Sequence, residues 1–341
     1  MRISSRLLSI VIIAGLAACS GGSGTVPPGP TGATGTNHMS AQPVPRRVTD
    51  STTGGTRAIL YTREIELSGR VSTGPSGTRT TLAAATNMLY NGGVVQTAPH
   101  IYVVYWGSAW TTTGDPRHVQ TYLNNFLSRV GGSSWLGTVT QYTQTVSGLK
   151  TAVGNAAGSY AGTWNDTSTI PNLNSSSTYQ SYLAAEAQRA ATHFGNHSQS
   201  AHYIIALPHG VKVYQFAGSC GWICYFIGAY CAWHSTTTSS GSTIAFTNLP
   251  YQPDAGSSCG AGLVNGSTAY DDGVSIVAGH EQAEAETDPQ LNAWYDSSGS
   301  EIGDKCAWTN LQDTSFGGGT LGTNDFPTQP LWSNAVSGCV Q

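Results

Sequence analysis

A histidine and four carboxylates lie within nine residues, from His280 to Asp288. On a helix, residues four apart share one face, so His280, Glu284 and Asp288 would point the same way, with Glu281 about 100° around from His280. The H-E-x-x-E pattern differs from the H-E-x-x-H zinc-peptidase helix by a glutamate in place of the second histidine, and carboxylate oxygen is also a zinc ligand. The segment predicts a metal site with His280 and Glu284 as ligands and Glu281 as an adjacent acid.

Negative charge is concentrated around this segment. Between Tyr270 and Asp304 the chain has nine of its 18 acids and no lysine or arginine. Like charges four residues apart destabilise a helix, and acids near its C-terminus oppose the helix dipole. A bound divalent cation would remove that cost. The alternative that needs no ion is a solvated acidic helix face.

The N-terminus has the features of an export signal. Arg2 and Arg6 precede an apolar run from Leu7 to Leu16 that is too short for an ordinary membrane-spanning helix. The run ends in Leu-Ala-Ala-Cys, which resembles the lipobox of bacterial lipoproteins. This resemblance implies a signal peptide over 1–18, lipidation of Cys19 and, with Ser20 following, location at the outer membrane. An ordinary secretory signal cut nearby is the alternative.

Composition divides the rest of the chain into three parts. Residues 19–47 are rich in glycine, proline and serine and predict a flexible tether. Residues 48–91 have few large apolar side chains apart from a predicted strand over 59–67, and we interpret them as an N-terminal extension or pro-segment. Residues 92–341 are long enough for one large domain.

Six cysteines remain after Cys19, an even number that favours three disulfides in an exported protein. Their pairing cannot be read from the sequence; they are Cys220, Cys224, Cys231, Cys259, Cys306 and Cys339. A zinc knuckle of the first three with His234 is the alternative. Only 9% of residues are charged and three are lysine, so the chain lacks the basic surface that nucleic-acid binding requires.

Hydrophobic periodicity predicts an α/β or α+β fold in which a mixed β-sheet packs with helices and carries disulfide-bearing loops. The metal helix starts at Asp271 or Asp272 as N-cap and runs to Thr287, before Pro289. Since the residue before a proline avoids helical geometry, Asp288 is a poor ligand candidate. The other elements are strands over 99–107, 202–208 and 243–247, helices over 115–131 and 177–194, and short strands and loops across 211–249.

The order of several motifs resembles the EXORDIUM, or phosphate-induced, family of secreted plant proteins, and more closely its microbial relatives, over residues 90–340. The motifs are Tyr90-Asn91-Gly92-Gly93 with Val103-Val104-Tyr105-Trp106-Gly107, the helix after Asp115, the cluster from Cys220 to His234, Asp272-Gly273, Thr287-Asp288-Pro289 with Trp294-Tyr295, and Glu301 to Cys306. Plant members have no established enzymatic activity and lack the His-Glu pair. Microbial relatives that have it, with a following E-I-G-D, resemble metallopeptidases of the zincin type.

The resemblance implies the third ligand. In the plant pattern an acid remains at the position of Glu301 but not at that of Asp304, so Asp304 is the expected ligand and Glu301 the alternative. We therefore predict a zinc-dependent peptidase, either anchored at the outer membrane through its lipid or secreted to the extracellular space, in which Glu281 acts as general base on a metal-bound water. Two carboxylate ligands leave Ca²⁺ or Mn²⁺ open.

Two alternative functions remain open from the residues alone. One is a non-catalytic cell-surface or carbohydrate-binding module with a structural metal, using aromatic side chains such as Trp106, Trp110, Trp135, Trp164, Tyr295 and Trp308. Another is a carboxyl peptidase without metal.

Two further histidines could each have a functional or a structural role. His234 is either an oxyanion donor or a hydrogen-bonding core residue, and His209 is either a functional or an ordinary loop residue.

Overall fold

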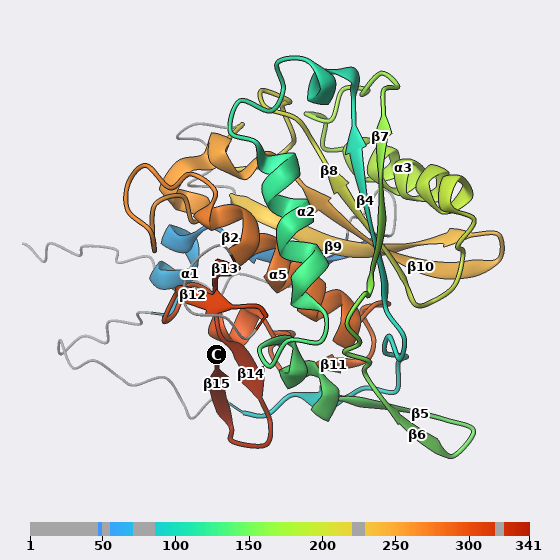
Figure 1. Ribbon diagram of the computed structural model, residues 1–341. Helices are drawn as coiled ribbons and strands as arrows, with labels where there is room; N and C mark the ends of the chain where they lie inside the picture. The colour runs from blue at the N-terminus through green and yellow to red at the C-terminus, as the bar shows by residue number, and fades with distance from the viewer. Residues whose placement is uncertain (1–46, 50–54, 71–85, 220–228, 318–323) are drawn as a thin grey trace, which may run out of the picture. The chain divides into compact units, whose positions relative to one another are not determined.

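In this computed structural model, one seven-stranded mixed sheet organises the described residues (Figure 1). These residues are 47–49, 55–70, 86–219, 229–317 and 324–341, and all belong to one unit, residues 40–341. The strands occur in the order β1 (Arg47–Thr49), β2 (Thr56–Tyr61), β9 (Tyr230–Ser239), β10 (Ser242–Leu249), β8 (Ala201–Ala206), β4 (His100–Trp106) and β7 (Tyr160–Asp166). The predicted mixed α+β fold is confirmed.

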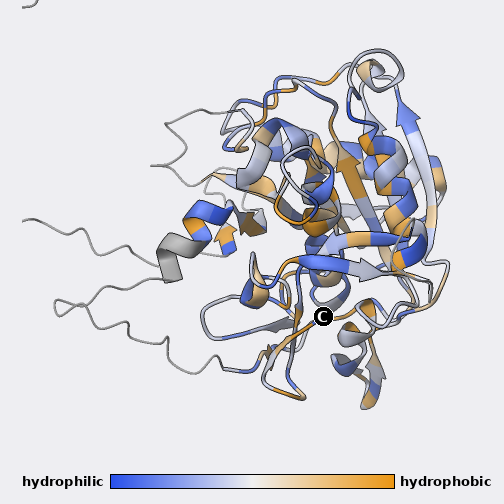
Figure 2. Cartoon of the chain, turned by 60° about the vertical axis from the view of Figure 1, so that its left-hand side comes forward, coloured by the Kyte–Doolittle hydropathy of each residue, from blue (hydrophilic) through white to orange (hydrophobic). Residues whose placement is uncertain are grey.

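The sheet has an antiparallel half and a parallel half. Pairs β1–β2, β2–β9 and β9–β10 are antiparallel, whereas β10–β8, β8–β4 and β4–β7 are parallel. All six residues of β8 are buried, as are all but the first residue of β4, and Figure 2 shows an orange, hydrophobic strand inside the molecule. Burial on both faces explains why these strands are continuous apolar runs rather than alternating patterns.

Helices cover both faces of the sheet. On β9, the Trp233 ring packs edge-on against Tyr179 at the start of α3 (Tyr179–Phe194), whereas the next residue, His234, contacts Glu281 of α5 (Asp272–Thr287). Successive strand residues face opposite sides, so α3 and α5 lie on opposite faces. Helix α2 (Val119–Val130) packs against α5 on the same side.

Smaller elements surround this core. Among the described residues they are helix α1 (Arg63–Arg70), the 3₁₀ segments η1 (Ser108–Thr111), η2 (Leu136–Gln141), η3 (Gln252–Cys259) and η4 (Asp304–Cys306), and four two-stranded sheets. The strand pairs are β3 (Leu89–Tyr90) with β11 (Trp294–Tyr295), β5 (Thr143–Val146) with β6 (Leu149–Ala152), β12 (Gln312–Ser315) with β13 (Asp325–Thr328), and β14 (Leu331–Ser333) with β15 (Gly338–Val340).

Most predicted elements are present, with three corrections. The predicted strand over 59–67 ends at Tyr61, and α1 follows it; the region 211–249 contains the long hairpin β9–β10 rather than short strands. The helix predicted from Asp115 starts at Val119, because the Asp115 carboxylate accepts the N–H groups of Val119 and Gln120 from outside the helix. Strands β1 and β2 are part of the central sheet, although Arg47 was interpreted as the end of the tether and the other residues of both strands as an extension or pro-segment.

Two disulfides join described cysteines, Cys231 to Cys259 and Cys306 to Cys339. The first excludes Cys231 from the zinc knuckle considered above. Cys220 and Cys224 lie outside the described residues, as do the signal segment, Cys19 and most of the tether.

An arginine-centred cluster ties α3 to the end of β7. Arg189 binds Asp166 and Glu186, with 2.8 Å between its Nη1 and Glu186 Oε2. Burial raises the pKa of Glu186 from 4.5 to about 8, and the hydrogen bond with Asp166 adds to the rise while Arg189 opposes it. Glu186 therefore favours its protonated form in the folded protein.

The raised pKa of Glu186 predicts that the folded protein loses stability as pH rises. A carboxyl whose pKa is raised by folding destabilises the fold as pH rises from about 4.5 to about 8, because only the unfolded chain releases the proton. In Glu186→Gln we expect the decrease in unfolding free energy over this range to shrink by on the order of 2 kcal/mol, measured by urea unfolding. Glu64→Gln, at an exposed acid of α1, is the control. Identical profiles for Glu186→Gln and wild type would contradict the assignment.

Candidate metal centre

Helix α5 is buried on every side. All of its residues from Asp272 to Thr287 are buried, which excludes the solvated acidic face as an explanation for its charges. Neither aspartate caps its start through a side-chain hydrogen bond: Asp272 instead accepts the N–H groups of Val264 and Asn265. At its other end, the N–H of Asp288 donates to the carbonyl of Glu284.

His280, Glu284 and Asp304 converge. The first two are one turn apart, with His280 Nε2 3.1 Å from Glu284 Oε1, and His280 Nε2 is 3.8 Å from Asp304 Oδ1. One ligand atom from each of the three lies within 4.8 Å of the others, and all three residues are at most 1% exposed. The structure thus brings together the three residues predicted as ligands, from two separate segments.

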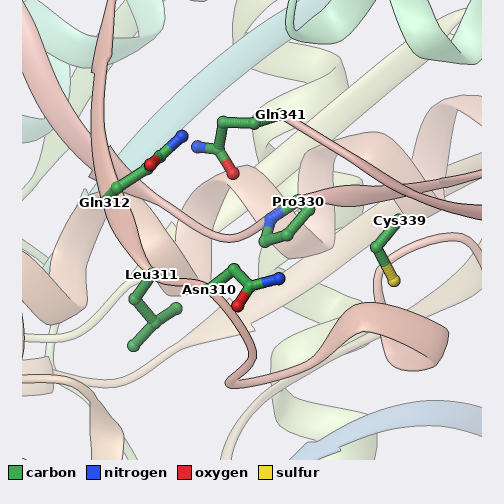
Figure 3. Close-up of a pocket in the computed structure, with 6 residues that line it drawn as sticks. All are labelled: Asn310, Leu311, Gln312, Pro330, Cys339 and Gln341. Atoms are coloured by element: carbon green, nitrogen blue, oxygen red, sulfur yellow. The ribbon is translucent and has the colours of Figure 1, made fainter.

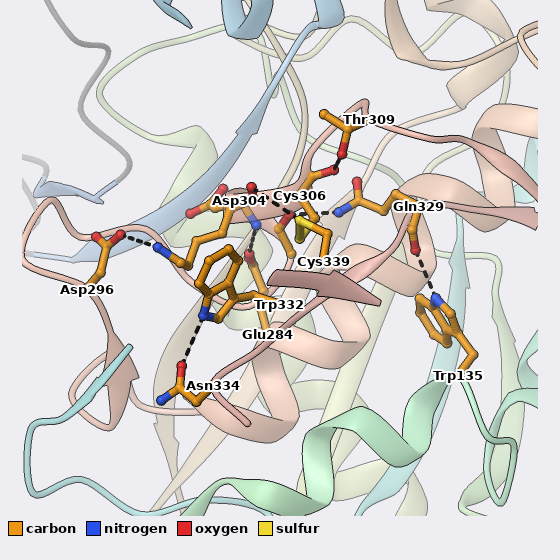
Figure 4. Close-up of a disulfide and its surroundings, with 12 residues drawn as sticks. Trp135, Glu284, Asp296, Asp304, Cys306, Thr309, Gln329, Trp332, Asn334 and Cys339 are labelled. Carbon is orange, nitrogen blue, oxygen red and sulfur yellow. Dashed lines mark hydrogen bonds and ion pairs between the residues drawn. A yellow bond between two sulfur atoms is a disulfide. The ribbon is translucent and has the colours of Figure 1, made fainter. Parts of the chain in front are cut away.

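The segment that carries Asp304 is held firmly. The backbone N–H of Asp304 donates to Glu284 Oε1 at 3.0 Å, and the Gln329 side chain donates to the carbonyl of Gly303 at 2.7 Å. Figure 4 shows these bonds beside the disulfide between Cys306 and Cys339. A site-bearing loop with such support holds its side chain in a fixed position.

Glu281 points to β9 rather than to solvent. Its Oε2 is hydrogen-bonded to His234 Nδ1 at 3.3 Å, and the same nitrogen is 3.6 Å from Glu284 Oε2. His234, Glu281 and Glu284 form a second group whose ligand atoms lie within 4.8 Å. Burial lowers the pKa of His234 well below its usual value, so the ring is neutral. The local sequence pattern does not place His234 at this metal site, because it does not show the register of the strand.

Glu301 and Asp288 lie at the edge of this cluster. Glu301 Oε2 is 3.8 Å from His234 Nε2, and its Oε1 accepts from Arg47 at 2.8 Å. Glu301 is therefore next to His234, whereas Asp304 is the acid next to His280. Asp288 binds Arg47 and two backbone N–H groups, in agreement with its exclusion from the ligands.

A bound cation would stabilise the buried acids of α5. Burial, followed by the neighbouring carboxylates, raises the pKa values of Glu281 and Glu284, and neither acid pairs with a lysine or arginine in the described part of the chain. Glu281 Oε1 and Glu284 Oε2 make no hydrogen bond to any described residue. Since buried polar atoms are rarely left unsatisfied, this donor set of imidazole and carboxylates fits a divalent metal.

Other candidates lie elsewhere. His209 is half exposed and pairs with Asp254, at 2.5 Å between His209 Nδ1 and Asp254 Oδ1. Of the six aromatic side chains considered for a carbohydrate surface, Trp106, Trp110, Trp135 and Trp308 are buried in the core and only Trp164 and Tyr295 are partly exposed.

A separate cavity of about 390 Å³ opens near the C-terminus (Figure 3). Asn310, Leu311, Gln312, Pro330, Cys339 and Gln341 line it. None of these six carries an acid, a base or a free thiol, since Cys339 is in a disulfide, so this cavity offers no group for catalysis.

Comparisons with known proteins give no relative from which a function could be transferred: no family model matches the chain, and no curated protein or solved structure does. The resemblance to the EXORDIUM family therefore stays a prediction. The assignment of the site depends on its own geometry.

Gly303 provides a test of that geometry. An alanine Cβ at this position would lie 2.5 Å from His280 Nδ1 and 2.8 Å from its Cε1, although φ and ψ of −79° and −43° suit alanine. We expect Gly303→Ala to displace the imidazole and to lower zinc affinity by about tenfold or more, measured by chelator competition. Gly137→Ala is the control, because its Cβ would meet only Asn155 Nδ2, at 3.5 Å. Unchanged zinc affinity in Gly303→Ala would argue against His280 as a ligand.

Proposed function

We propose that this chain is an exported, metal-dependent hydrolase, most simply a zinc peptidase, with His280, Glu284 and Asp304 as metal ligands. The observation that carries this proposal is the convergence of one nitrogen and two carboxylate groups, all buried, from α5 and from η4. Three protein ligands leave a fourth position for water or substrate. When bound, zinc would supply an acidic water and an electrophile for the scissile carbonyl.

Glu281 has the arrangement that a general base needs. One carboxylate oxygen is held by His234 Nδ1, and the other makes no hydrogen bond within the described residues. The first contact fixes the orientation of the carboxylate, while the second oxygen is available to accept a proton and pass it to the leaving amine. His234 acts here as a positioning residue that holds Glu281.

The metal and the substrate class form part of the proposal. Imidazole with two carboxylates suits zinc, while the oxygen-rich donor set also suits Mn²⁺ or Ca²⁺. Elemental analysis of purified protein decides between them. The substrate we propose is a peptide or protein, because a water activated by a metal and a glutamate is suited to amide hydrolysis.

The disulfides agree with the proposed export of the protein. The two disulfides fit an oxidising, exported compartment. In the part of the chain that the structure describes, no helix has the length and apolar character to cross a bilayer. We propose that anchoring at the outer membrane depends on lipidation of Cys19.

Complete burial of the cluster favours one alternative function, a non-catalytic binding module with a structural metal. His280, Glu281 and Glu284 are fully buried, as expected of a structural cation that stabilises a binding module. A metal-free carboxyl peptidase is a third candidate, which resistance of hydrolysis to chelators would support.

Glu281→Gln separates catalysis from structural metal binding. The substitution keeps the shape and the contact with His234 but removes the proton acceptor, so we expect kcat on a peptide library to fall about 10²- to 10⁴-fold while the metal content remains. Glu286→Gln is the matched control, since Glu286 is equally buried on α5 but hydrogen-bonds to Gln282.

Two results would count against this assignment. Wild-type activity in Glu281→Gln would show that Glu281 is not the base. Absence of both metal and cleavage in the wild-type protein would exclude the proposed function, whereas metal without cleavage would support the structural alternative.

A further inference from the structure

Arg47, in the edge strand β1, inserts its side chain between residues of the segment 288–301. Its guanidinium binds Asp288 Oδ2, donates to Glu301 Oε1 at 2.8 Å and donates to the carbonyl of Leu291 at 2.6 Å. Its Cζ lies 3.9 Å from the centre of the Tyr295 ring. Two carboxylates, a carbonyl and an aromatic face are the groups that recognise a guanidinium.

The pocket is organised by other parts of the chain. Asp288 Oδ1 accepts the N–H groups of Asn292 and Ala293, both at 2.6 Å, which leaves Oδ2 directed at the cation. Both Asp288 and Glu301 are fully buried. A pocket whose acceptors are fixed by their own contacts loses little entropy on binding its ligand.

The pocket adjoins the candidate metal centre. Glu301 contacts Arg47 through one oxygen and lies 3.8 Å from His234 Nε2 through the other, and the opposite nitrogen of His234 contacts Glu281. The Arg47 side chain is 16% exposed, whereas the acids and histidines around it are buried. Arg47 therefore lies between solvent and the buried cluster.

Strand β1 is a minor part of the sheet. It has three residues and pairs only with β2 among the described strands. Its removal from the edge would expose the pocket and break no pairing between other strands.

We propose that the pocket of Asp288, Glu301, Tyr295 and the Leu291 carbonyl recognises a basic side chain of the substrate, an arginine above all, and that β1 fills it with Arg47 as an internal substitute. The proposal rests on the hydrolase function proposed above and names its substrate class. Displacement of β1 would then vacate the recognition pocket and uncover Glu301, which lies beside His234 of the candidate metal centre.

Peptide binding to the full-length protein tests this proposal. The probes are two blocked pentapeptides of alanine with a central arginine or citrulline, which has nearly the same shape without the charge. Chelator is present so that no cleavage occurs, and affinity is measured by calorimetry. For Arg47→Ala we expect the arginine peptide to bind at least about tenfold more tightly than the citrulline peptide, about 1.4 kcal/mol. Wild type should not distinguish the two.

Arg189→Ala is the matched control, since Arg189 also bridges two acids but at the junction of α3 and β7. It should behave as wild type. Equal binding of both peptides to Arg47→Ala, or the same preference in Arg189→Ala, would overturn the proposal and leave Arg47 as a structural ion pair.

Arg47→Lys covers the case in which Arg47→Ala does not fold. Lysine keeps the charge but loses the forked hydrogen bonds and the planar contact with Tyr295, so a smaller preference for the arginine peptide is expected. Absence of any preference in this variant would overturn the proposal. If the variant prefers the arginine peptide but the protein neither binds metal nor cleaves peptides, the recognition pocket is supported and the hydrolase function is rejected. If the protein cleaves peptides but shows no preference for arginine, the hydrolase function is supported and the recognition pocket is rejected.

Discussion

The burial of several carboxylates between a helix and a sheet is the constraint on which the rest of this structure depends. Glu281, Glu284, Glu301 and Asp304 are all at most 1% exposed. Transfer of such groups from water costs several kcal/mol each unless they are protonated, paired or bound to a metal. Two histidines and Arg47 surround the four acids, and burial keeps His234 neutral. With these four acids ionised, Arg47 and one divalent ion would offset three of the four negative charges, with the donors already in place.

The sheet and the disulfides explain how such a cluster is held together. Antiparallel pairing of β9 with β2 and β10 fixes His234 against α5, because Ala58 and Thr247 flank it in register. The Cys306–Cys339 bridge links η4 to β15, while the N–H of Trp332 on β14 donates to the carbonyl of Ile302. Each ligand segment thus has support from elements distant in sequence. Mutual repulsion of the acids would otherwise separate the helix from the loop.

Local sequence rules predicted part of this site and could not predict the rest. The contact of His280 with Glu284 follows from the helical period. Only the family resemblance implies Asp304 as a ligand, because its position depends on a turn whose path is not encoded in any hydrophobic period. His234 and Arg47 lie on strands whose register is set by long-range pairing. Complete burial of α5 was also unpredictable, since its sequence lacks an apolar stripe.

Burial and catalysis make opposite demands on this site. A low-dielectric environment strengthens the interaction of charged ligands with a metal and orients a base, but it also excludes the substrate. A metal site with only a structural role would be most stable if the core of the sheet enclosed it completely. Here one side is closed by a partly exposed arginine from a three-residue edge strand, bound to an acid that contacts the site histidine. Displacement of this strand, as proposed above, would uncover Asp288 and Glu301, and Glu301 is the acid that links the edge of the sheet to His234.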